Sequence, residues 1–167
     1  MNYEKVDKCS VSNGAGVRTV LWVSGCDVHC HNCHNPQTWD FNSGIPFTHD
    51  TIQEILYNLS KPYIKGLTLS GGHPLDPHNA PKVLEIVKRV KMVFPNKDIW
   101  IYSGYEWENI IKDETLREIL EYTDVLVDGA YVDELRDISL AFRGSSNQRI
   151  IDVKKTLDSN EVILWQE

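Results

Sequence analysis

Short apolar segments rich in β-branched residues alternate with longer amphipathic segments along most of this chain. The short segments predict strands and the amphipathic ones predict helices, because surface helices repeat apolar residues every three to four positions. The predicted strands span residues 17–24, 66–70, 98–103 and 124–128, with a further short strand at 162–165. The predicted helices span residues 48–60, 79–94 and 105–122, the last with a break near Asp113. This order indicates a parallel sheet whose strands are joined by right-handed crossovers.

The number of predicted strands limits the architecture. Four or five strands cannot close an eight-stranded barrel, so we expect an α/β fold in the form of an open, partial (βα) barrel with a mostly parallel sheet. The 167 residues show no internal repeat, linker or low-complexity tract. We therefore expect one domain that spans residues 1–167.

Residues with unusual chemistry follow the predicted strands directly. Gly25 and Cys26 follow the first strand, and the turn Gly71-Gly72-His73 follows the second. Glycines also follow the third and fourth strands. Because parallel strands end at the same edge of a sheet, and ligands bind at that edge, the cysteine loop and the Gly-Gly turn should meet in space.

Three of the four cysteines form the pattern Cys-x3-Cys-x2-Cys: Cys26, Cys30 and Cys33. Three thiolates on a short loop can hold three irons of a [4Fe–4S] cluster and leave the fourth iron open to a small ligand. A zinc site is the structural alternative, because three cysteines and one of the interleaved histidines (His29, His31 and His34) would make a closed tetrahedral set. The loop alone favours iron–sulfur and leaves zinc open.

Cys9 lies upstream of the first predicted strand, where it need not reach the carboxyl edge of the sheet. An ordinary semi-buried cysteine is therefore a better interpretation than a fourth cluster ligand.

Charge and hydropathy exclude several classes of partner. The net charge of −7 argues against nucleic acid, because phosphate binding needs a surplus of Lys and Arg. No apolar run approaches the ~20 residues that a membrane span needs. The first residues, MNYEKVDKCS, lack the apolar region of a signal peptide, so we expect a cytoplasmic protein.

Longer stretches resemble one family of enzymes. The cysteine spacing is the signature of the radical S-adenosylmethionine superfamily, and NGAGVR (13–18), SGC (24–26) and CHNPQTW (33–39) resemble its glycyl-radical activating enzymes. Within these, SGIPFT (43–48), LSGGHPL (69–75) and RGSSNQR (143–149) are similar to the branch that activates anaerobic ribonucleoside-triphosphate reductases. The combined motifs outweigh the zinc interpretation. The activating enzyme of pyruvate formate-lyase shares part of the pattern, so activation of another glycyl-radical enzyme is the alternative.

The resemblance implies a fold of the radical S-adenosylmethionine type and a [4Fe–4S] cluster on Cys26, Cys30 and Cys33. The open iron would bind S-adenosyl-L-methionine, and its reductive cleavage would give a 5′-deoxyadenosyl radical. That radical would take a hydrogen atom from a glycine on the large subunit of the anaerobic ribonucleotide reductase. An electron donor such as a flavodoxin would reduce the cluster. The cofactors carry this chemistry, so we expect no catalytic acid, base or nucleophile from the protein.

The same resemblance implies which residues surround the cofactor. Gly71 and Gly72 would border the methionine amino group, and Asn32, Cys33 and His34 would lie against the cofactor. Asn32 departs from the family, since many members carry an aromatic residue there, and this puts a ring contact with adenine in doubt. For His34, an exposed position or a supporting role behind the cofactor contacts is an equal alternative.

His73 is a second departure, because the resembling families usually carry Asp or Glu after Gly-Gly. We expect a neutral His73 ring to accept a hydrogen bond from the methionine amine, more weakly than a carboxylate by about 1 kcal/mol. The bond should fail as the ring protonates near its unperturbed pKa of about 6.5. The alternative is that His73 points away and that backbone carbonyls or Asp76 do this work.

Two further features allow both a structural and a functional interpretation. Residues 143–149 are either a polar surface loop or a segment that shapes the pocket or docks the large subunit. Core or interface packing is the better interpretation of four tryptophans, Trp22, Trp39, Trp100 and Trp107.

Overall fold

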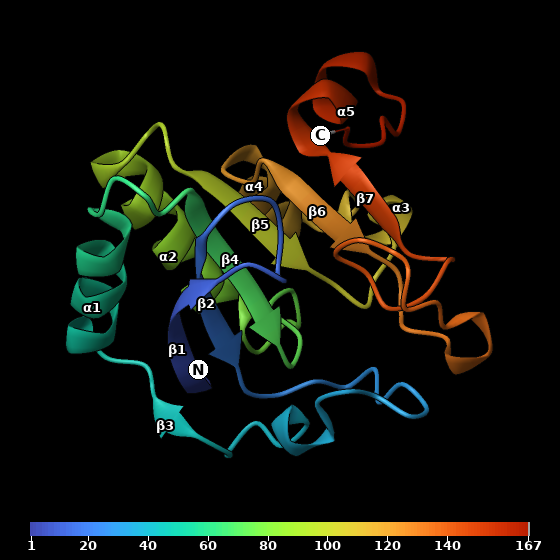
Figure 1. Cartoon of the computed structure of the whole chain (residues 1–167), viewed down its shortest axis with the longest axis horizontal. Helices are drawn as coiled ribbons and strands as arrows, with labels where there is room; N and C mark the ends of the chain where they lie inside the picture. The colour runs from blue at the N-terminus through green and yellow to red at the C-terminus, as the bar shows by residue number, and fades with distance from the viewer. Residues whose placement is uncertain (167) are drawn as a thin grey trace.

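The structure is a computed structural model that describes residues 1–166, and within them a seven-stranded mixed sheet has the order β3-β1-β2-β4-β5-β6-β7 (Figure 1). The strands are β1 (Asn2–Ser10), β2 (Arg18–Val23), β3 (Ile45–Pro46), β4 (Gly66–Gly71), β5 (Asp98–Tyr102), β6 (Val125–Asp128) and β7 (Arg149–Asp152). The α-helices are α1 (His49–Leu59), α2 (Ala80–Val93), α3 (Trp107–Ile110), α4 (Glu114–Glu121) and α5 (Val153–Ser159). Two short 3-10 helices are η1 (Pro36–Thr38) and η2 (Asp133–Leu135).

The four central strands confirm the predicted alternation. Strands β2, β4, β5 and β6 pair in parallel, and their bounds lie within two residues of the predicted ones. The predicted break near Asp113 separates α3 from α4, because the Asp113 carboxylate accepts a hydrogen bond from the backbone N–H of Leu116 (2.9 Å) and caps α4. No helix among residues 1–166 is long and apolar enough to cross a membrane.

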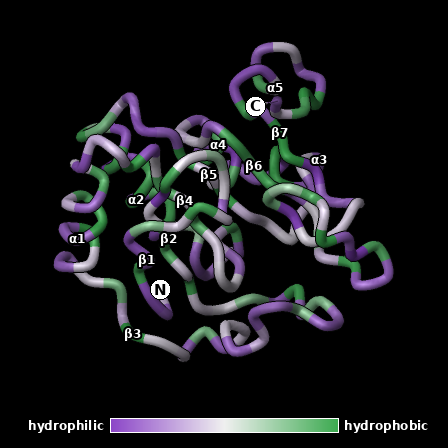
Figure 2. Tube along the Cα trace, viewed as in Figure 1, coloured by the Kyte–Doolittle hydropathy of each residue, from purple (hydrophilic) through white to green (hydrophobic). Residues whose placement is uncertain are grey.

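Alternate residues of the central strands face two different layers, as strand geometry requires. Leu67, Leu69 and Ile101 belong to the same buried cluster as the apolar faces of α1, α2 and α4. Trp100 and Val127 face the other way and form a second, smaller cluster. Figure 2 shows the hydrophobic residues concentrated along the central strands and the hydrophilic ones along the outer loops. One face of the sheet is therefore covered by helices, and loops cover the other.

The predicted fold class, an open partial (βα) barrel with a mostly parallel sheet, is wrong. Of the six strand pairings among residues 1–166, three are parallel and three are antiparallel. Strand β1 pairs antiparallel with both β2 and β3, and β7 pairs antiparallel with β6. The prediction failed at the two edges of the sheet, because β1 and β7 carry polar residues and show no buried-strand pattern. These two strands become ordered by hydrogen bonding to strands that are already formed. The predicted strand at 162–165 is reduced to one bridge between Leu164 and Ile151.

Arg18 is a fully buried charge beneath the N-terminal loop. Its Nε donates to Thr68 Oγ1 (2.7 Å) and its Nη2 pairs with the Asp98 carboxylate (2.6 Å). The guanidinium also lies 5.3 Å from the centre of the Trp100 ring. A buried charge is tolerated only when it is paired and hydrogen-bonded. Arg18 Nη1 also donates to the carbonyl of Ala15 (3.1 Å), and Thr68 Oγ1 donates to that of Asn13 (2.8 Å), so this cluster attaches the loop before β2 to the sheet.

Candidate active site

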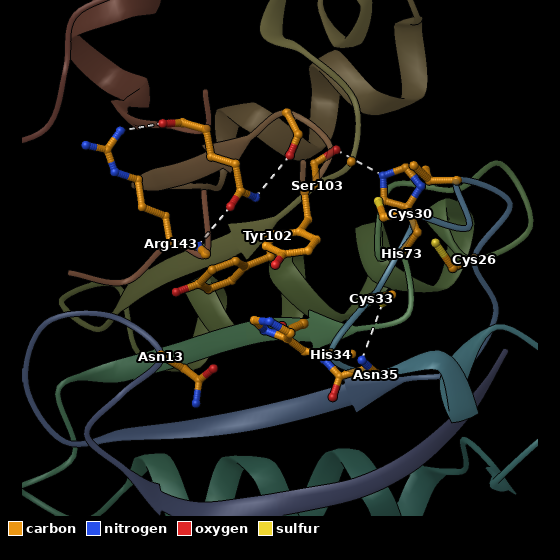
Figure 3. A pocket seen from close by; sticks show the side chains of 18 of the residues that line it. Asn13, Cys26, Cys30, Cys33, His34, Asn35, His73, Tyr102, Ser103 and Arg143 are labelled. Carbon is orange, nitrogen blue, oxygen red and sulfur yellow. Dashed lines mark hydrogen bonds between the residues drawn. The ribbon is translucent and has the colours of Figure 1, made fainter. Parts of the chain in front are cut away.

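The carboxyl ends of β2, β4, β5 and β6 border a cavity of about 580 Å³, which is within the usual range for small-molecule sites. The cysteine loop and residues 12–13 also line it, and a further wall comes from residues 129–148, which link β6 to β7 and are called the strap below. Figure 3 shows the three cysteines and His73 on one side of this cavity and Asn13 and Arg143 on the other. The predicted edge of the sheet therefore carries a cavity large enough for a nucleoside-sized ligand.

The cysteine loop supplies three thiols to one wall of the cavity. Cys26, Cys30 and Cys33 are half-buried, form no disulfide and all line the cavity. Burial raises the pKa of the Cys26 and Cys30 thiols, so in the chain alone both are protonated at neutral pH. Among residues 1–166, no three His, Cys, Asp or Glu side chains converge as a site for a single metal ion. Three thiols spread along one wall fit a cluster that takes a separate iron on each cysteine.

The Gly-Gly turn after β4 contacts the start of the cysteine loop directly. The backbone N–H of Gly72 donates to the carbonyl of Val23 (2.8 Å), and that of His73 donates to the carbonyl of Gly25 (2.7 Å). A Cβ on Gly72 would lie 2.4 Å from the Gly25 carbonyl oxygen, so only glycine permits this approach. Two segments that are far apart in the sequence thus meet at the cavity, as the strand order predicted.

His73 is almost fully buried and lines the cavity. Its Nε2 lies 3.0 Å from Ser103 Oγ, which also accepts a hydrogen bond from the backbone N–H of Tyr105 (3.0 Å). Its Nδ1 is buried and has no hydrogen-bond partner within the described part of the chain. Burial lowers the pKa of His73 to about 4, so the ring is neutral at neutral and mildly acidic pH. The expectation that the ring protonates near 6.5 is therefore wrong, because that value belongs to a solvated imidazole.

The two residues that flank Cys33 differ in position. His34 is exposed but lines the cavity, and its ring packs against that of Tyr131, with ring centroids 4.9 Å apart. Asn32 does not line the cavity, and its side-chain amide donates to a carboxylate oxygen of Asp133 (2.8 Å). Contact between His34 and a cofactor stays a prediction, and the Asn32 side chain is directed toward the strap.

Cys9 lies away from the cavity. It is exposed, so the prediction of a semi-buried cysteine is wrong. Because β1 runs antiparallel to β2 and pairs Ser10 with Arg18, Cys9 lies near the amino edge of the parallel strands. The cysteine loop leaves the opposite edge, so Cys9 is not placed to complete the same ligand set.

Several cavity residues were not assigned to the site from the sequence. Trp100 and Trp107 are buried as predicted, but Trp22 and Trp39 line the cavity. Tyr102 also lines it, and its hydroxyl donates to the carbonyl of Phe142 in the strap (2.8 Å). The signal that could have found Tyr102 is its place as the last residue of a parallel strand.

Residues 143–149 help to shape the pocket, because Arg143, Gly144 and Gln148 line the cavity. Docking of the large subunit by this segment stays a prediction. Gln148 organises this turn, since its Oε1 accepts from the backbone N–H of Gly144 (2.9 Å) and its Nε2 donates to the carbonyl of Gly129 (3.1 Å). Arg149 pairs with Asp128 at the base of the strap (Nε to Oδ1, 3.0 Å). The strap is thus closed at its base and held against the ends of β5 and β6.

Comparisons with known proteins place the chain among iron–sulfur proteins. Residues 12–151 match the family described as "4Fe-4S single cluster domain". The chain is 45% identical over 150 residues to the anaerobic ribonucleoside-triphosphate reductase-activating protein of Enterobacteria phage T4, covering 90% of this chain and 93% of the relative. It is 42% identical over 150 residues to the protein of the same name from Escherichia coli (strain K12), covering 89% and 96%. A relative from Pasteurella multocida with that name is 43% identical over 152 residues, covering 90% and 96%.

Proposed function

This chain belongs to the family of anaerobic ribonucleoside-triphosphate reductase-activating proteins, and we propose that it activates its reductase by radical S-adenosylmethionine chemistry. The observation that carries the proposal is the cavity where three free cysteines, the Gly71-Gly72 turn and His73 Nδ1 meet, a nitrogen with no hydrogen-bond partner among residues 1–166. When bound, a reduced [4Fe–4S] cluster supplies the electron that splits S-adenosyl-L-methionine into methionine and a 5′-deoxyadenosyl radical, which removes a hydrogen atom from a glycine of the reductase.

The three cysteines act as ligands in this proposal. Cys26, Cys30 and Cys33 would each hold one iron, and the fourth iron would remain free for the methionine amino and carboxylate groups. Since burial keeps Cys26 and Cys30 protonated in the chain alone, loading of the cluster must release protons. The half-buried position of all three limits the access of water to the thiolates.

Gly71, Gly72 and His73 would recognise the methionine end of the cofactor. The absence of a Cβ at Gly71 and Gly72 allows a ligand to approach the backbone closely. We assign to His73 the tautomer in which Nε2–H donates to Ser103 Oγ, whose two lone pairs then accept from His73 and from Tyr105 N–H. Nδ1 is then a free acceptor for an N–H of the methionine amine. Because the pKa of His73 is about 4, this acceptor persists throughout the mildly acidic range.

The other walls of the cavity would keep water and oxygen away from the radical. Trp22 and Trp39 supply apolar surface on the side of the cysteine loop, and Phe142 supplies it on the strap. Exclusion of water protects a reactive intermediate from side reactions. The macromolecular partner is the large glycyl-radical subunit of the reductase, and a donor such as a flavodoxin would reduce the cluster in the cytoplasm. One radical S-adenosylmethionine domain, residues 1–167, carries all these roles.

The ligand assignment is tested by measuring iron and sulfide in four single Cys→Ala variants after anaerobic reconstitution. We expect the variants at Cys26, Cys30 and Cys33 to lose the cluster and the variant at Cys9 to keep it. Loss at Cys9 together with retention at Cys30 would refute the assignment.

The activity is tested with the loaded protein, dithionite, S-adenosyl-L-methionine and the large reductase subunit. We expect 5′-deoxyadenosine as a product and a glycyl radical signal in electron paramagnetic resonance. A fully loaded, reduced protein that forms no 5′-deoxyadenosine in the presence of its partner would show that the radical mechanism is wrong.

A further inference from the structure

The backbone turns in the same unusual way before each cysteine of the loop. Gly25, His29 and Asn32 directly precede Cys26, Cys30 and Cys33, and their φ angles are +94°, +47° and +53°. Glycine adopts this left-handed region freely, whereas a residue with a side chain does so at a cost in energy. The left-handed residues before Cys30 and Cys33 therefore need contacts that stabilise them.

Asn32 has such a contact, and it comes from the strap. Its Nδ2 donates to Asp133 Oδ2 (2.8 Å), the one side-chain hydrogen bond that Asn32 makes to the described residues. The other oxygen of Asp133 accepts from the Tyr131 hydroxyl (2.6 Å). The Tyr131 ring in turn packs against His34. Residues on both sides of Cys33 are thus held by the strap, about 100 positions later in the chain.

We propose that Asp133 is a positioning residue for the iron–sulfur cluster, acting through Asn32 on the backbone that presents Cys33 to the cavity. The proposal rests on the proposed function, since it requires Cys33 to be a cluster ligand. Asp133 touches neither cluster nor cofactor. It stabilises the left-handed conformation of Asn32, so that the third thiol is already directed into the cavity before the cluster is loaded. Groups that orient a ligand in this way typically change metal affinity by about 10- to 100-fold when they are removed.

The test compares four reconstituted full-length proteins: the parent, Asp133→Ala, Glu134→Ala and the double variant Asn32→Gly/Asp133→Ala. Glu134→Ala is the matched control, because it removes an exposed carboxylate from the next position, which makes no hydrogen bond to Asn32. The double variant tests the cause, because glycine at position 32 adopts the left-handed backbone without help from Asp133. The readouts are iron and sulfide per chain, the rate of iron loss to a chelator, and the electron paramagnetic resonance spectrum of the reduced cluster without S-adenosyl-L-methionine.

We expect Asp133→Ala to lose its cluster roughly tenfold faster than the parent and to show an altered spectrum. Tenfold is the lower end of the usual range, and we expect it because the contact between Asn32 and Asp133 is exposed. Glu134→Ala should match the parent, and the double variant should return to within about twofold of it. Equal rates of cluster loss in Asp133→Ala and the parent would overturn this inference and leave the proposed function standing. The inference would also be overturned if the double variant lost its cluster as fast as Asp133→Ala, or if both variants failed to fold. A parent protein that holds no cluster would instead refute the proposed function, and this inference with it.

Discussion

Burial of the neutral His73 ring should make the stability of the folded chain depend on pH in a way that can be calculated. The pKa of His73 is about 4 in the folded chain, whereas a solvated histidine in the unfolded chain has a pKa of about 6.5. Above about pH 6.5 both states are neutral and the ring contributes no pH dependence. As the pH falls from about 6.5 toward 4, the unfolded chain binds a proton that the folded chain does not, so stability is lost. Below about pH 4 both states are protonated and the loss is complete.

The expected magnitude follows from this difference. At pH 5.5, one unit below the unfolded pKa, the unfolded chain gains about 1.4 kcal/mol by protonation and the folded ring remains almost entirely neutral. At pH 7.5 the corresponding gain is below about 0.1 kcal/mol. His73 should therefore lower the free energy of unfolding by about 1.3 kcal/mol between pH 7.5 and pH 5.5.

The assay is urea unfolding of the cluster-free chain at both pH values, for the parent and for His73→Asn. The variant removes the titrating group, so its free energy of unfolding should fall by about 1.3 kcal/mol less than that of the parent over this interval. His49→Asn, at the exposed start of α1, is the control for the loss of a histidine as such. If His73→Asn and the parent lose the same free energy, burial does not hold the ring neutral and the reasoning is refuted.

Three other substitutions follow from the described contacts. Arg18→Ala should lower the free energy of unfolding by about 3–5 kcal/mol in urea titrations, because it leaves the buried partners of the guanidinium unpaired. The control Lys8→Ala, which breaks an exposed ion pair, should cost less than about 1 kcal/mol, and equal losses would contradict the assignment. Gly25→Ala should cost about 2 kcal/mol, because φ is +94° and the new Cβ would lie 2.0 Å from the Phe41 ring; a loss below about 0.5 kcal/mol would speak against it. His73→Asp should bind S-adenosyl-L-methionine at least as tightly as the parent by calorimetry, up to about fivefold tighter at pH 7.5, because a carboxylate accepts the stronger bond. A variant that binds much more weakly would show that His73 does not occupy the place of a carboxylate.

The sequence alone determined the central part of the fold and the place of two parts of the site, the cysteine loop and the Gly-Gly turn. The apolar runs at β2, β4, β5 and β6 and the amphipathic helices between them predict parallel strands. The carboxyl edge of those strands then brings Cys26 to the Gly71-Gly72 turn. This inference was sound because hydrophobic periodicity and strand direction are local properties of the chain, and the edge at which strands end follows from topology. The cysteine spacing and the Gly-Gly turn are local as well.

The edges of the sheet required the tertiary structure. Strands β1 and β7 are polar or short, and each becomes a strand by pairing with a neighbour that is already formed. No pattern within these segments reports such pairing, because β propensity depends on the cross-strand context. The direction of β1 also decided that Cys9 lies at the far edge, which its place in the sequence could only suggest.

The environment of individual side chains was also decided only by the tertiary structure. Whether His73 titrates near 6.5 or near 4 depends on how deeply the ring is buried beside Ser103 and Tyr105, and this is a property of packing. Asn32, chosen from the sequence for its position beside Cys33, instead donates its amide to Asp133, about 100 residues away. Hydrogen bonds between distant segments follow from the folded path of the chain, and local residue patterns carry no record of them.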